Sequence, residues 1–92
     1  MGVTFSIPAP YRKITGGKAE VEVQAGTVRQ AIDGLAAAYP DMARRLLNEK
    51  RGLNPYVSVY VNGEHLHGEG ALERQVADGD RLVVMPVVGG GG

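Results

Sequence analysis

Cysteine is absent from the 92-residue sequence. Disulfide bonds are therefore excluded, and so is a persulfide carried on a side chain. If the chain were to hold sulfur covalently, its C-terminal carboxylate would have to be the point of attachment. Tryptophan is also absent, and aromatic residues make up only 5% of the chain. The hydrophobic content of 43% is nevertheless enough for the core of one small domain.

The sequence also lacks an excess of either charge, because ten Lys and Arg residues balance ten Asp and Glu residues. This balance provides no basic surface for nucleic acid or for an anionic membrane, so we predict neither partner. No apolar run is long enough to span a bilayer. The first residues carry neither a charged lead nor a hydrophobic segment, and we therefore expect a cytoplasmic protein without a secretory signal.

Two short segments near the N-terminus alternate apolar and polar residues, which is typical of strands buried on one face. They are residues 3–7 and 19–23. Pro8 ends the first segment, because proline cannot donate a hydrogen bond to a sheet. A turn signal at residues 15–18 lies between the two segments. We predict that they pair as an antiparallel hairpin with a long connection.

The strongest helix signal begins at Thr27. Thr27 and Gln30 have the spacing of a capping box, in which each side chain satisfies the free backbone N–H of the other residue. We predict that Pro40 stops this helix and that Asp41 caps a short second helix ending at residue 47. Apolar residues follow helical spacing along the first helix and define its buried stripe: Val28, Ala31, Ile32, Leu35 and Tyr39.

The second half of the chain has the pattern of three strands. Residues 56–61 are rich in β-branched and aromatic residues, and Asn62-Gly63 is the preferred pair for a type I′ turn. The remaining predicted elements are a return strand at 64–67, a single helical turn around Leu72, a tight turn at Asp78-Gly79-Asp80 and a last strand at 81–85. Several strands with one main helix predict an α+β domain, with the helix packed across a mixed sheet.

Strand alternation separates a buried face from an exposed one. The predicted core residues are Phe5, Val21, Ile32, Leu35, Val59 and Leu82. Tyr60, Val83 and Met85 are then expected to point away from the helix. Together with Val87 and Val88, they would form an apolar patch suited to docking a partner protein. The alternative is that they are half-buried sheet residues without a partner.

The chain ends in four glycines, Gly89, Gly90, Gly91 and Gly92. Glycine loses the most conformational entropy on ordering, and four in a row cannot pack into a stable element. We therefore divide the chain into a domain over residues 1–86 and a flexible tail over residues 87–92. A tail without Cβ atoms could pass through a narrow channel and deliver its carboxylate to a buried catalytic site. A frayed end or a cloning remnant is the alternative.

The tail and the strand order together resemble the ThiS/MoaD family of ubiquitin-like sulfur carriers. The resemblance rests on residues 59–63, on Asp78-Gly79-Asp80, and on Pro86 with the valines and glycines that follow it. Residues 6–8, Arg12 and residues 15–17 are similar to the CysO-type members of this family, which supply sulfur for cysteine biosynthesis. The helix break at Pro40 and the long segment before Tyr56 are similar as well.

This resemblance implies a β-grasp fold, with a mixed sheet of four to five strands, and the role of a protein substrate rather than an enzyme. An E1-like enzyme would use ATP to adenylate the C-terminal glycine, and a sulfur donor would convert it to a thiocarboxylate. A cysteine synthase dependent on pyridoxal phosphate would accept the sulfur, and a metalloprotease would release the product. The chain itself would bind no cofactor. The reactive residue would be Gly92, or Gly90 or Gly91 if the tail is trimmed, because the family usually ends in two glycines.

Two other functions fit the same sequence features. A ubiquitin-like modifier would use the same tail to form isopeptide bonds with target lysines, and a non-covalent interaction domain would not use the tail at all. Thiamin, molybdopterin and natural-product pathways are alternative destinations for the sulfur. His65 and His67 could face one metal ion, but we interpret them as surface residues. Asp78 and Asp80 lie too close to a turn to suggest acid–base catalysis.

Overall fold

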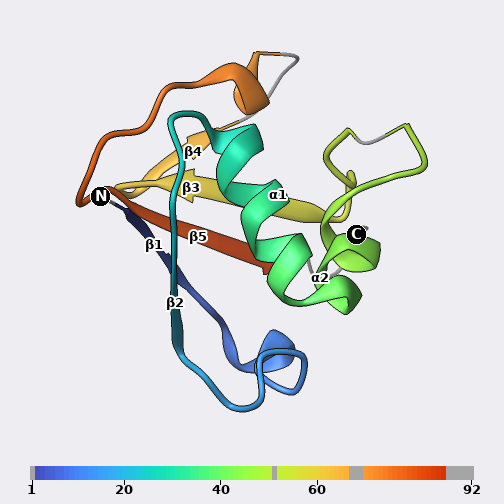
Figure 1. The fold of residues 1–92 in the computed structure, drawn as a ribbon. Coiled ribbons are helices and arrows are strands. Elements are labelled where there is room, and N and C mark those ends of the chain that lie inside the picture. The colour runs from blue at the N-terminus through green and yellow to red at the C-terminus, as the bar shows by residue number, and fades with distance from the viewer. Residues whose placement is uncertain (1, 51, 67–69, 87–92) are drawn as a thin grey trace.

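The computed structural model describes residues 2–50, 52–66 and 70–86. Within these residues, five strands form one mixed sheet in the order β2-β1-β5-β3-β4 (Figure 1). Strand β5 is central and runs parallel to β1, whereas the other neighbouring pairs are antiparallel. The strands are β1 (Val3–Ser6), β2 (Glu20–Val23), β3 (Val57–Val61), β4 (Glu64–Leu66) and β5 (Arg81–Pro86).

The predicted N-terminal hairpin is confirmed. Val3 pairs with Val23 at one end of the hairpin, and Ser6 pairs with Glu20 at the other. The long connection contains a short 3-10 helix, η1 (Ala9–Tyr11), which begins directly after Pro8 and buries Tyr11. The connection therefore contributes an aromatic side chain to the hydrophobic core.

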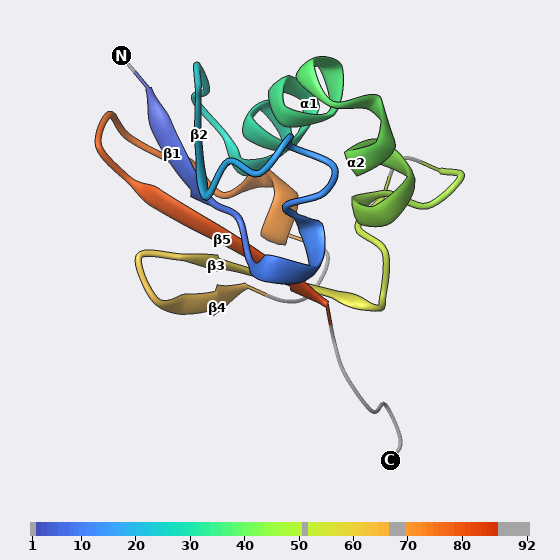
Figure 2. The same cartoon turned by 90° about the horizontal axis from the view of Figure 1, so that it is seen from below.

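Two helices lie on the same side of the sheet, α1 (Val28–Ala38) and α2 (Pro40–Leu46), as Figure 2 shows. The Thr27 hydroxyl accepts a hydrogen bond from the Gln30 backbone N–H at 3.2 Å, as predicted. The second half of the capping box differs from the prediction, because Gln30 Oε1 accepts from the N–H of Gly26 at 2.7 Å and not from Thr27. The backbone on either side of Thr27 is bonded to the segment that includes Arg74 and Val76, which holds the chain in this position.

The predicted stop of the first helix at Pro40 is confirmed, but the predicted cap of the second helix is wrong. Helix α1 does end before Pro40, at Ala38, but Pro40 is itself the first residue of α2. Proline is well tolerated there because the first N–H of a helix has no partner within the helix. Asp41 therefore lies inside the first turn and does not cap the helix, which ends at Leu46.

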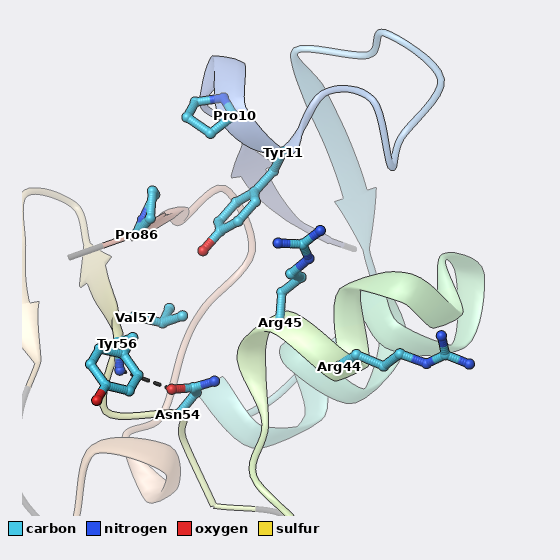
Figure 3. A pocket seen from close by; sticks show the side chains of 8 residues that line it. All are labelled: Pro10, Tyr11, Arg44, Arg45, Asn54, Tyr56, Val57 and Pro86. Carbon is cyan, nitrogen blue, oxygen red and sulfur yellow. Dashed lines mark hydrogen bonds between the residues drawn. The ribbon is translucent and has the colours of Figure 1, made fainter. Parts of the chain in front are cut away.

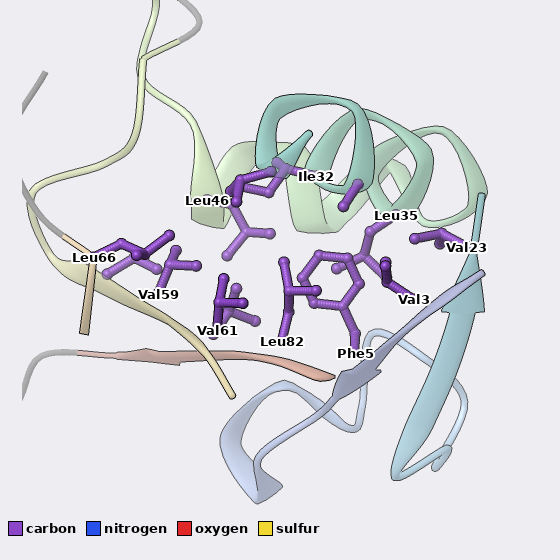
Figure 4. Packing of buried hydrophobic residues seen from close by; sticks show 14 of the residues in the cluster. Val3, Phe5, Val23, Ile32, Leu35, Leu46, Val59, Val61, Leu66 and Leu82 are labelled. Carbon is purple, nitrogen blue, oxygen red and sulfur yellow. The ribbon is translucent and has the colours of Figure 1, made fainter. Parts of the chain in front are cut away.

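The core lies between the helices and the sheet (Figure 4). The predicted core residues are at most 1% exposed, with the exception of Val21. Val21 is only partly buried because β2 is an edge strand of the sheet. Helix α2 adds two fully buried side chains that were not predicted, Met42 and Leu46.

The predicted turns are confirmed where the structure describes them. Asn62 and Gly63 have φ values of 50° and 87°, the positive values that a type I′ turn requires. The single helical turn around Leu72 is η2 (Ala71–Glu73). The return strand β4 is described as far as Leu66, and its predicted last residue, His67, lies outside the described residues.

The predicted α+β fold class and β-grasp architecture are confirmed. One main helix, α1, packs across a five-stranded mixed sheet, and α2 extends the same layer. Figure 2 shows no described element covering the opposite side of the sheet. We call this side the outer face.

Candidate functional site

Strand β5 determines where the C-terminal segment leaves the domain. It lies between β1 and β3, and its last residue, Pro86, pairs with Val57 at the start of β3. The chain continues for six residues beyond this point. The predicted tail glycines, Gly89 to Gly92, and the predicted docking residues Val87 and Val88 lie outside the described residues.

Three predicted docking residues are neighbours on the outer face. Tyr60 on β3 is directly opposite Val83 on β5, and Met85 is two residues further along β5, opposite Ser58. The residues that alternate with them, Val59, Val61, Leu82 and Val84, are at most 1% exposed on the core side. The predicted strand faces are therefore correct, and we call the group of Tyr60, Val83 and Met85 the outer patch.

The outer patch is a surface of partly exposed apolar side chains. Met85 is 43% exposed, whereas Tyr60 and Val83 are half-buried. The Tyr60 ring stacks on the imidazole of His65, with ring centroids 4.9 Å apart. This contact links the outer patch to β4, which the sequence analysis did not predict.

An ion pair borders the outer face on the opposite edge of the sheet. Arg81 Nη1 on β5 lies 2.8 Å from Glu20 Oε2 on β2 and spans the intervening strand β1. Both side chains are about half exposed, so the pair contributes little to stability.

The Asp78-Gly79-Asp80 turn has a structural role. Asp78 Oδ1 accepts a hydrogen bond from the N–H of Gly2 at 2.7 Å, which ties the N-terminal strand to this turn. Asp80 accepts from the N–H of Ala77 at 2.8 Å and from the Asn62 amide at 3.1 Å. The backbone hydrogen bond from Ala77, followed by the one from Asn62, lowers the pKa of Asp80 below its ordinary value. Both carboxylates thus serve as turn acceptors.

Within the part of the chain that the structure describes, no group of three potential metal ligands is brought together. His65 is engaged with Tyr60, and its predicted companion His67 lies outside this part. No helix among the described residues is both long and apolar enough to cross a membrane.

A hollow at the end of the sheet, beside Pro86, was missed by the sequence analysis. It is formed by Tyr11 from η1, Arg45 from α2, and Tyr56 and Val57 at the start of β3. Tyr11, Arg45 and the Tyr56-Val57 pair are far apart in the sequence and follow no shared motif. Tyr56 was assigned to the strand, whereas it precedes β3 and is 71% exposed. Only the folded connection between β1 and β2 brings Tyr11 to this end of the molecule.

Comparison with known proteins finds similar proteins that match almost the whole chain. The sequence profile of the ThiS family matches residues 5–91. The chain is 37% identical over 93 residues to the sulfur carrier protein CysO of Mycobacterium tuberculosis (strain ATCC 25618 / H37Rv), covering 99% of this chain and all of that protein.

Solved structures with the same fold include both carriers and modifiers. A chain of the Amycolatopsis orientalis BexX/CysO complex is 40% identical with a TM-score of 0.86, over 97% of this chain and 99% of that one. SAMP1 from Haloferax volcanii, a small archaeal modifier protein, is 29% identical with a TM-score of 0.84, over 99% of this chain and all of that one.

Proposed function

Because the chain belongs to the ThiS family, we propose that it is a sulfur carrier whose C-terminal glycine is converted to a thiocarboxylate. The supporting relative is the sulfur carrier protein CysO, which is similar over its entire length. The chain would act as a protein substrate, and its partner enzymes would supply the catalytic groups.

The proposed chemistry has two steps at the terminal carbonyl carbon. A carboxylate oxygen of the last glycine attacks the α-phosphorus of ATP, and pyrophosphate leaves, which gives an acyl-adenylate. The sulfur of a donor then attacks the carbonyl carbon, and AMP leaves with the bonding electron pair. With hydrogen sulfide as the donor, loss of a proton then gives the thiocarboxylate, which has one sulfur in place of one oxygen. The chain has no cysteine that could hold the sulfur instead.

The observation that carries this proposal is the position of the last strand. Because β5 is the central strand of the sheet and Pro86 pairs with Val57 on β3, the chain leaves the domain at a fixed point. Six residues follow, which reach at most about 20 Å when fully extended. The last four are glycines, which fit a channel too narrow for side chains. We therefore propose residues 1–86 as the docking domain and residues 87–92 as the delivered segment.

Cysteine biosynthesis is the destination that we propose for the sulfur, because the similarity to CysO extends over 99% of this chain. The thiocarboxylate sulfur would attack the β-carbon of an activated serine held by a synthase that depends on pyridoxal phosphate, and the activating group would leave. Transfer of the acyl group from sulfur to nitrogen would leave cysteine attached to the carrier by an amide bond. A metalloprotease would hydrolyse this bond and regenerate the carboxylate.

Protein modification is the second candidate function. It is supported by the similarity to SAMP1, which has the same fold over the full length of both chains. The acyl-adenylate would then be attacked by a lysine amine, either directly or through an enzyme-bound intermediate. The two functions share the activation step and differ in the nucleophile that follows it.

We propose that the outer patch docks the activating enzyme, and Met85→Asp tests this role. The exposed Met85 side chain would enter an apolar contact, where a carboxylate would lose its hydration without gaining a partner. We expect the KM of the activating enzyme for the carrier to rise by about 10- to 100-fold. The measurement is ATP–pyrophosphate exchange at varied carrier concentration.

Ala37→Asp is the matched control, because Ala37 is exposed on α1, on the side of the sheet opposite to the outer patch. It introduces the same charge and should leave the KM unchanged. An unchanged KM for Met85→Asp would remove the outer patch from the docking mechanism. A large loss of melting temperature in Met85→Asp would instead show that the side chain is structural.

A further inference from the structure

The hollow beside Pro86 is a small pocket whose lining residues come from several elements. Its volume is about 320 Å³, within the range of ligand-binding pockets. Figure 3 shows the Tyr11 ring projecting into it from η1, with its hydroxyl directed toward Val57 and Pro86. The Arg45 side chain extends from α2 toward the same ring.

Tyr11 has an unusual environment for a tyrosine. The residue is only 5% exposed, yet no described residue is a hydrogen-bond partner of its hydroxyl, which opens onto the hollow. Burial raises the pKa of Tyr11, and the charge of Arg45 offsets part of this effect. The phenol therefore keeps its proton at neutral pH and is available as a donor. Because it faces the open hollow, the hydroxyl can donate a hydrogen bond to an acceptor that enters the hollow.

The other polar groups of the hollow are donors as well. Asn54 Oδ1 accepts a hydrogen bond from the N–H of Tyr56 at 2.9 Å, which leaves the Asn54 amide group as a donor. No carboxylate lines the hollow, and among the described residues none forms an ion pair with Arg45. The neighbouring Arg44 lies 3.9 Å from Asp41 and points away from Tyr11.

We propose that this hollow binds a carboxylate side chain of the protein that receives the C-terminus. Arg45 would pair with the carboxylate, and Tyr11 would donate a hydrogen bond to it. An arginine and a tyrosine at the edge of a pocket are also the residue types that contribute most to protein interfaces. The identity of the partner rests on the proposed function, whereas the binding of a carboxylate does not.

The location of the hollow favours a partner protein as the source of the carboxylate. Because Pro86 lines the hollow, any protein that takes up the residues after Pro86 must approach this end of the sheet. The Val57–Pro86 pair is next in register to the Ser58–Met85 pair, but Val57 lies on the core side of the sheet, so the hollow and the outer patch are on opposite faces. The acidic group of the partner would therefore bind at the base of the tail, on the helix side of the sheet.

Acetate is the probe for the anion site. We expect NMR titration of the ¹⁵N-labelled full chain, at constant ionic strength, to give saturable shifts at Tyr11, Arg45 and Asn54. Arg45→Gln should weaken acetate binding about tenfold, and Tyr11→Phe should also weaken it, since each removes one hydrogen bond to a charged group. Arg29→Gln is the matched control, because Arg29 lies in the first turn of α1 and does not line the hollow. This variant should bind acetate normally. Absence of saturable shifts, or equal affinity in Arg45→Gln, would overturn the proposed site.

Two further arms identify the source of the carboxylate. If a partner supplies it, blocking the terminal carboxylate of the full chain as a methylamide should leave acetate affinity unchanged. An increase would show that the chain's own C-terminus competes for the hollow, and would overturn the assignment to a partner. Arg45→Gln should also raise the KM of the activating enzyme about tenfold with unchanged kcat. If the unaltered chain binds acetate but Arg45→Gln leaves the KM of the activating enzyme unchanged, the hollow is an anion site that this enzyme does not use, and the assignment to a partner is overturned. This outcome does not depend on whether the chain carries sulfur.

Discussion

Removal of residues 89–92 is expected to lower the rate of adenylation by at least about 100-fold while the domain folds normally. The carboxylate must reach the α-phosphate of ATP, and even a small misplacement of reacting groups costs a factor of this size. The truncated chain would be shorter by about 13 Å on the extended-chain scale. Activation is measured by ATP–pyrophosphate exchange, and folding by the melting temperature.

Shorter deletions separate tail length from tail composition. Removing only Gly91 and Gly92 leaves a diglycine end. Normal activation of that chain would show that Gly90 can serve as the adenylated C-terminal residue. Gly92→Val keeps the length and adds a branched side chain, which should block thiocarboxylate formation if the channel accepts only bare backbone. A normal rate after removal of all four glycines would contradict the sulfur-carrier proposal.

Leu35→Ala is expected to cost about 2–5 kcal/mol of unfolding free energy. Leu35 is fully buried on α1 and packs against the sheet (Figure 4). Its replacement leaves a cavity in addition to removing apolar contacts. A domain of this size has a total stability of roughly 5–15 kcal/mol, so much of it would be lost. Urea denaturation followed by circular dichroism measures the change.

Leu53→Ala removes the same atoms from a partly buried position outside the helices and is the matched control. Its cost should be clearly smaller, because the site is already accessible to solvent. Equal losses in the two variants would contradict the packing of α1 across the sheet.

Strand positions and faces could be predicted because they depend on a local rule. Alternation along residues 56–61 and 81–85 correctly separated Val59 and Leu82 in the core from Tyr60 and Met85 outside. The error at Val21 has a different origin, because alternation gives the face of a residue but not the position of its strand in the sheet. Val21 is on the inner face, but β2 is at the edge.

Two of the failures depended on contacts between distant segments, the hydrogen-bond partner of the Gln30 side chain and the missed hollow. Gln30 bonds to Gly26 where the chain runs beside residues 74–76, and no pattern near Thr27 indicates that neighbour. The hollow was missed for the same reason, since Tyr11 and Arg45 meet Pro86 only in the folded domain. Its donors could not be recognised as one site from sequence spacing.

The mass of the intact protein purified from its native cells tests the central proposal most directly. Replacement of one terminal oxygen by sulfur adds about 16 Da to the chain. We predict a species with this increment, located on the C-terminal residue by fragmentation and lost on treatment with an alkylating reagent that captures thiocarboxylates. A population found only as the unmodified carboxylate and as adducts linked to lysines of other proteins would contradict the sulfur-carrier proposal and support protein modification.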